Sequence, residues 1–135
     1  MNRSRLESNL QSVRDRIGRA TERAGRPEDA VTLVAVTKRR PDEWTRALVG
    51  LGAFDLGENY PQELWAKADA LADLPIRWHG IGHLQGNKAK KTLPMVRMLH
   101  GVDSLRLLQT LDELVESLGL IDPPSVCLQI NTSAE

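Results

Sequence analysis

The chain has 135 residues, enough for one ordinary domain with a hydrophobic core and too few for two. Its 18 basic and 18 acidic side chains cancel, so no net charge draws it to nucleic acid or to an anionic membrane surface. It has no apolar run of membrane-spanning length, no apolar core of a signal peptide near its start, and no internal disulfide partner for its single cysteine, Cys127. We therefore expect one domain in a reducing, cytoplasmic compartment.

The first thirty residues predict a helix. Apolar side chains recur there at helical spacing, at Leu6, Leu10, Val13 and Ile17. The expected amphipathic helix covers residues 2–24, and Gly25 and Pro27 provide its stop. We expect residues 1–29 to form this helix and a turn, and residues 30–135 to complete a single domain.

A first strand is predicted at residues 31–37, "VTLVAVT", and it ends in a lysine. These seven residues are uncharged and mostly β-branched or aliphatic, which is typical of a strand buried on both faces of a parallel sheet. Pro41 suits the first turn of a following helix, and Asp42 and Glu43 suit that helix's positive end. Because α/β proteins bind ligands at the carboxyl ends of their strands, Lys38 occupies a position favoured for chemistry.

Helix-like and strand-like segments then alternate to the end of the chain. The expected helices begin at Pro41, at Pro61, at residue 87 and at Asp103 or Ser104, and the expected strands cover residues 53–59, 76–84, 96–104 and 125–133. Such alternation is typical of a parallel α/β architecture. Five strands suit either an open doubly wound sheet or the first five strands of an eight-stranded TIM-type barrel, and periodicity does not separate the two.

Two of the predicted strand ends carry candidate binding groups. The amine of Lys38 forms a Schiff base with an aldehyde only when it is unprotonated, a form that burial or neighbouring cations favour. A strand-end lysine that is merely solvated is the alternative. In "GENY", residues 57–60, the amide of Asn59 can both donate and accept hydrogen bonds, although turn chemistry explains Gly57 and Asn59 equally well.

The stretch "HGIGHLQGNK", residues 79–88, invites a metal or a nucleotide interpretation. In an extended chain His79 and His83 lie ~13 Å apart, too far to share one ion, so we expect no metal. The glycine spacing matches neither the dinucleotide fingerprint nor the P-loop. His79 remains a candidate for stacking on a planar ligand or hydrogen bonding to it, with a satisfied core histidine as the alternative.

Several stretches together carry a family resemblance. In order and spacing, "LVAVTKRRP", "FDLGENYPQE", "WHGIGHLQGNK", "HGVDSL" and "LQINTSAE" resemble successive motifs of the pyridoxal phosphate homeostasis proteins, whose barrel is similar to the alanine racemase N-terminal domain. The resemblance runs from about residue 30 to the last residue. It implies the first five strands of a barrel, pyridoxal 5′-phosphate (PLP) as cofactor, a Schiff base at Lys38, and Asn59 and His79 beside the pyridine ring.

The sequence departs from the family pattern in two ways. Arg40 stands where members commonly carry a second lysine, and it cannot form a Schiff base. Family chains also continue through three further strands, which hold their phosphate-binding loops. We therefore expect weakened cofactor affinity, together with open sheet edges through which the chain self-associates.

The resemblance favours an intracellular PLP carrier or reservoir without turnover, which would supply PLP-dependent apoenzymes. A PLP-dependent racemase or decarboxylase is the second hypothesis, but it needs a further acid/base group opposite the lysine. A nucleic-acid module built on Lys88, Lys90 and Lys91 is the third, although few aromatic residues accompany these lysines. A truncated fragment that binds nothing is also consistent with the sequence.

Overall fold

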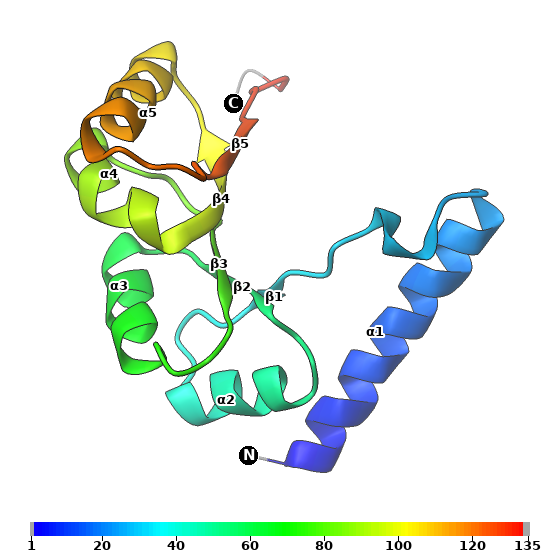
Figure 1. Cartoon of the computed structure of the whole chain (residues 1–135). Helices are drawn as coiled ribbons and strands as arrows, with labels where there is room; N and C mark the ends of the chain where they lie inside the picture. The colour runs from blue at the N-terminus through cyan, green and yellow to red at the C-terminus, as the bar shows by residue number, and fades with distance from the viewer. Residues whose placement is uncertain (1, 134–135) are drawn as a thin grey trace.

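The computed structural model describes residues 2–133 and shows five strands bordered by helices (Figure 1). The elements are α1 (Arg3–Arg23), the 3-10 turn η1 (Glu28–Ala30), β1 (Ala35–Val36), α2 (Asp42–Gly50), β2 (Asp55–Glu58), α3 (Pro61–Ala70), β3 (Arg77–Gly80), α4 (Gly86–Thr92), the 3-10 turn η2 (Leu93–Met95), β4 (Val96–Val102), α5 (Leu105–Leu118) and β5 (Ser125–Leu128).

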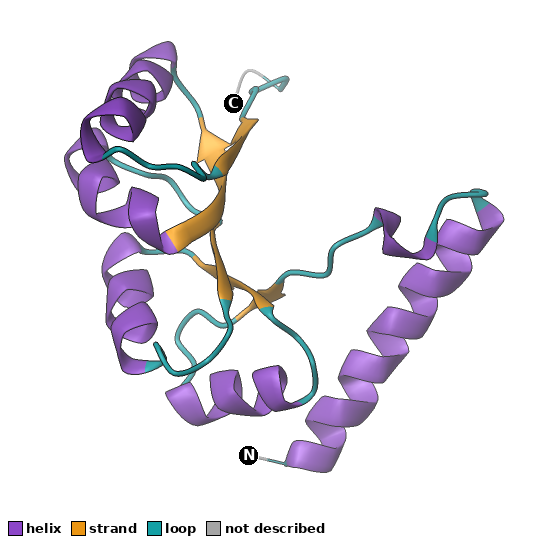
Figure 2. Cartoon of the chain, viewed as in Figure 1, coloured by secondary structure: helices purple, strands orange, loops and turns teal. Residues whose placement is uncertain are grey.

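The five strands form one parallel sheet in the order β1-β2-β3-β4-β5. Helices α2 to α5 border one side of this sheet (Figure 2), and α1 contacts the end of α2, where Arg14 donates to the Leu51 and Gly52 carbonyls at 3.0 and 2.8 Å. A doubly wound sheet would carry helices on both faces and reverse its strand order at a switch point. The sequential order with helices on one side is the arrangement of a barrel segment, so the predicted fold class is confirmed and the doubly wound alternative is wrong.

The hydrophobic core lies between the sheet and these helices. Its most deeply buried members are Leu56, Leu64, Leu71, Ala89 and Leu93. Because side chains alternate along a strand, Leu56 and Glu58 of β2 face α3, whereas Asp55 and Gly57 face the opposite, open side of the sheet. The open face and the carboxyl edge of the sheet therefore remain accessible to a ligand.

The first strand differs from its prediction. Only Ala35–Val36 pair as β1, with β2 as the neighbour, and Val31 and Val36 are 40% and 49% exposed. The prediction of a seven-residue strand buried on both faces was wrong, because β1 is an edge strand whose open face no described element covers. The fifth strand likewise ends at Leu128 instead of residue 133, and Leu128 is 62% exposed.

The two ends of α5 lie where the capping residues of the sequence predicted them. Ser104 caps α5 by accepting a hydrogen bond from the Leu107 amide at 3.2 Å, and Gly119 ends it with a φ of +61°, as predicted.

The third and fourth strands end at Gly80 and Val102, short of the expected residues 84 and 104. Within residues 2–133, no helix has both the length and the apolar character needed to cross a membrane.

Candidate functional site

Lys38 lies in a tight turn directly after β1, at the carboxyl edge of the sheet. The Arg40 amide donates to the Thr37 carbonyl at 3.1 Å and closes a four-residue turn in which Lys38 is the second residue. Arg39, the third residue, has a φ of +56°. Lys38 is exposed. The turn presents the lysine at the rim of the sheet.

The left-handed conformation of Arg39 makes a testable stability prediction. A residue with a Cβ pays roughly 1–2 kcal/mol to adopt this conformation, whereas glycine adopts it freely but loses more chain entropy on folding. We expect Arg39→Gly to raise the free energy of unfolding by up to about 1 kcal/mol and Arg39→Val to lower it by about the same amount. Urea denaturation of the two variants checks this. Equal free energies of unfolding for Arg39→Gly and Arg39→Val would contradict the left-handed conformation of Arg39 in the turn.

Asn59 lies beside Lys38 at the same edge. Val36 of β1 pairs with Gly57 of β2, so Lys38 and Asn59 each follow a paired residue by two positions and share one level of the sheet. The register thus puts the two residues at the same edge of the sheet.

The loop after β3 packs tightly on Asn59. A Cβ on Gly82 would overlap the Asn59 carbonyl oxygen and lie 2.7 Å from its side-chain Oδ1. A glycine is therefore required at position 82 if Asn59 is to keep its place. Beside Asn59, a hollow of about 270 Å³ continues along Tyr60, Gln62 and Lys88.

His79 of β3 lies on the open face, where it pairs with Gly57 of β2, two residues before Asn59. It is buried, and both ring nitrogens have partners: Nε2 lies 3.0 Å from Oδ1 of Asp55, and Nδ1 lies 2.9 Å from Nε2 of His100. The two imidazole rings are tilted by 42° with their centroids 5.2 Å apart. Protein groups thus occupy both ring nitrogens, and the two expected roles of His79 toward a planar ligand stay predictions.

The negative charge of Asp55 determines which groups donate and which accept in the hydrogen bonds that link Arg77, Asp55, His79 and His100. Arg77 donates to both oxygens of Asp55 at 2.9 and 2.6 Å, and these bonds, followed by the one from His79, hold the pKa of Asp55 below its usual value despite partial burial. The ionised carboxylate accepts from Nε2–H of His79, which leaves Nδ1 to accept from His100 when both rings are neutral. Asp55 and His100 thus fix the orientation of the His79 ring.

These groups predict how stability depends on pH. Burial, and secondly the neighbouring His79, lower the pKa of His100 from its ordinary value of 6.5. The unfolded chain therefore takes up this proton at a higher pH than the folded chain, so the free energy of unfolding should fall from about pH 7.5 to about pH 5. Below the ordinary value of 3.8, the lowered pKa of Asp55 adds a second loss.

The measurement is urea denaturation across this pH range, with His100→Gln as the comparison. Glutamine retains an N–H donor for His79 and does not titrate. We expect a shallower pH dependence in the variant between about pH 7.5 and about pH 5. Identical slopes for the wild type and His100→Gln would contradict the assignment.

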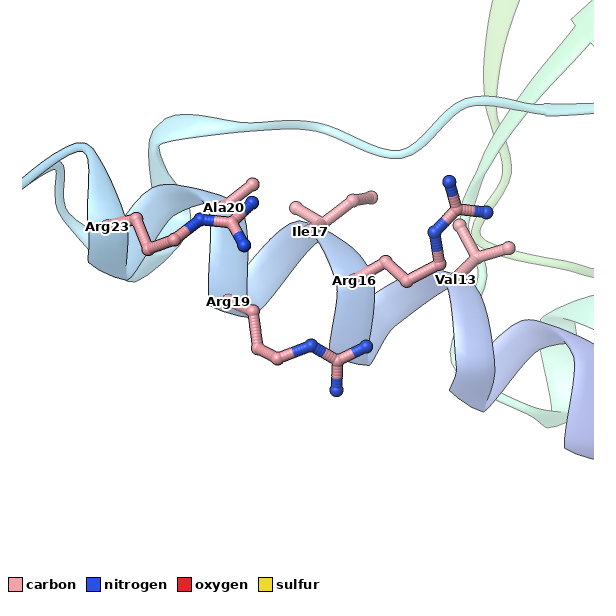
Figure 3. Close-up of a pocket in the computed structure, with 6 residues that line it drawn as sticks. All are labelled: Val13, Arg16, Ile17, Arg19, Ala20 and Arg23. Carbon is pink, nitrogen blue, oxygen red and sulfur yellow. The ribbon is translucent and has the colours of Figure 1, made fainter.

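The remaining candidates are not part of this arrangement. His83 is exposed and pairs with Asp103 at 3.0 Å, so the two histidines of the predicted motif have separate partners. Lys91 lies over the Trp65 ring at 4.5 Å and belongs to the face that α4 shares with α3. A further hollow of about 580 Å³ is lined by α1 alone, including Arg16, Arg19 and Arg23 (Figure 3), and it does not include Lys38 or Asn59.

One residue beneath the rim was missed by sequence reasoning. The Lys67 ammonium is buried and lies 2.6 Å from both the Thr37 carbonyl and the Glu58 carboxylate. A signal existed, because Lys67 falls on the apolar side of its helix between Leu64 and Leu71, where a charged side chain needs a buried partner.

The site defines a class of protein: a barrel segment of sequential parallel strands that presents a lysine amine at the carboxyl edge. No protein-family model matches the chain. It is 39% identical over 132 residues to the pyridoxal phosphate homeostasis protein of Pseudomonas aeruginosa, covering 98% of this chain and 56% of that protein. Against the protein of the same name in Escherichia coli K12 it is 35% identical, with 96% and 56% covered.

Solved structures agree with these relatives. PipY of Synechococcus elongatus PCC7942, solved with PLP bound, has a TM-score of 0.74 at 37% identity over 88% of this chain and 56% of that chain. A protein from Bifidobacterium adolescentis has a TM-score of 0.85 at 35% identity over 98% and 58%. The chain is thus similar to pyridoxal phosphate homeostasis proteins over nearly its whole length, and it spans about half the length of the curated relatives it matches.

Proposed function

We propose that this chain binds PLP through Lys38 and serves intracellular PLP homeostasis as a cofactor carrier or reservoir, without turnover. The relatives carry the name of this function, and PipY was solved with PLP bound. The observation that carries the proposal for this chain is the exposed Lys38 at the carboxyl edge of β1, level with Asn59. PLP-dependent apoenzymes in the cytoplasm would be the recipients of the cofactor.

The donor set of the rim fits the aldehyde and ring portions of PLP. Lys38 would hold PLP by condensation of its amine with the aldehyde, with loss of water. Asn59 offers an amide donor and acceptor beside that amine, and the buried His79 offers a ring face with its nitrogens already satisfied.

Covalent trapping tests the proposal. The chain is mixed with PLP, the C=N bond is reduced with borohydride, and the modified residue is identified by peptide mass spectrometry. We expect one adduct per chain, located at Lys38. Labelling scattered over many lysines would contradict a selective site, and exchange of amino-acid α-protons in deuterated water would contradict a carrier without turnover.

A further inference from the structure

Beneath the rim, three side chains form a buried polar cluster, the Lys67 cluster of Thr37, Glu58 and Lys67. Lys67 Nζ lies 2.6 Å from the Thr37 carbonyl oxygen and 2.6 Å from Glu58 Oε1, and the Thr37 hydroxyl donates to the same Oε1 at 2.6 Å. The Glu58 side chain is fully buried and the Lys67 side chain is 10% exposed. The cluster thus joins β1, β2 and α3 through short, directional bonds.

Each strand residue of the cluster directly precedes a candidate cofactor residue. Thr37 precedes Lys38, and its carbonyl accepts from both Lys67 and the Arg40 amide that closes the Lys38 turn. Glu58 precedes Asn59. One ammonium therefore holds, on the helix side of the sheet, the backbone that directly precedes Lys38 and Asn59.

A contribution to folding stability does not by itself explain why the charged Lys67 lies in the core. Lys67 lies on the buried stripe of α3, where an apolar side chain would pack against Leu64 and Leu71 at no desolvation cost. A buried ion pair is often no more stabilising than well-packed apolar residues of the same volume, but its hydrogen bonds fix geometry. The cluster is positioned to fix the orientation of the two strand ends.

We propose that Lys67 is a positioning residue of the cofactor site, which orients the Lys38 turn and Asn59 by holding the Thr37 carbonyl and the Glu58 carboxylate. This role rests on the proposed PLP function. It predicts that removal of the ammonium loosens the Lys38 turn even where the fold is retained.

Two variants test the role. Lys67→Met keeps the apolar stem and removes the ammonium, but it leaves the Glu58 charge unpaired in the core. Lys67→Met combined with Glu58→Gln removes both charges at nearly constant volume, and so separates geometry from the cost of the unpaired charge. Trp65→Phe, on the same helix, is the matched control, because it loses a 3.1 Å hydrogen bond to the Thr92 hydroxyl without touching the cluster.

The first measurement needs no cofactor. Amide hydrogen exchange at Arg40 reports the turn hydrogen bond to the Thr37 carbonyl. We expect exchange about tenfold faster in both Lys67 variants, as the loss of one charge-assisted support predicts, and unchanged exchange in Trp65→Phe. Unchanged exchange at Arg40 in both Lys67 variants, or an equal rise in Trp65→Phe, would overturn the proposal.

The second measurement is borohydride trapping of PLP with peptide mapping. We expect the Lys38 share of the label to fall about tenfold in both Lys67 variants and to stay at the wild-type level in Trp65→Phe. Wild-type labelling in the double variant would show that Lys67 only balances the Glu58 charge, and would overturn the positioning role. If the wild type itself labels without selectivity, the PLP function fails, and the Arg40 exchange still decides whether Lys67 holds the turn.

Discussion

Replacing Lys38 with arginine is expected to abolish selective trapping of PLP. Arginine keeps the positive charge and the length of the side chain, but its guanidinium stays protonated and does not form the C=N bond. Because Lys38 is exposed, the free energy of unfolding should change by less than about 0.5 kcal/mol. Loss of the adduct without loss of the fold would assign the covalent step to this one amine.

The measurement compares the reduced adduct by intact mass and peptide mapping in Lys38→Arg and in the wild type. Lys90→Arg, at an exposed position of α4, is the matched control and should label as the wild type does. A stoichiometric adduct at one other lysine of Lys38→Arg would show that the site selects a different amine. An adduct of undiminished stoichiometry in Lys38→Arg would refute the assignment of Lys38.

The second large effect is expected at Gly82. An alanine there would place its Cβ against the backbone of Asn59, and backbone atoms yield less readily than a flexible side chain. We expect Gly82→Ala to lower the free energy of unfolding by about 1–3 kcal/mol, the usual cost of overpacking. It should also reduce trapping at Lys38, because Asn59 moves from its place at the rim.

Gly86→Ala is the control for this substitution. A Cβ at Gly86, the first residue of α4, would meet no atom within 4 Å. Urea denaturation and trapping at Lys38 should therefore be unchanged or slightly improved in Gly86→Ala. If Gly82→Ala matched it in both measurements, the close packing of Asn59 by Gly82 would have no functional consequence.

Local chemistry predicted most of the elements. The caps at Ser104 and Gly119 set the ends of α5, and the alternation of strands and helices predicted a parallel α/β fold. Strand limits were less accurate, since pairing, which sequence does not show, decides where a strand ends. The seven apolar residues from Val31 to Thr37 have strand propensity, but only Ala35–Val36 have a neighbour with which to pair.

The sequence by itself showed Lys38 after an apolar run. It also showed the family motifs that contain Asn59 and His79. Periodicity did not separate the doubly wound sheet from the barrel segment, which the family resemblance implied, and the tertiary structure decided between them because strand order is a non-local property. It also brought Lys67 of α3 to Thr37, 30 residues away, and gave His79 its partners Asp55 and His100. These contacts join residues that are distant in sequence, and packing of helices and strands is what brings them together.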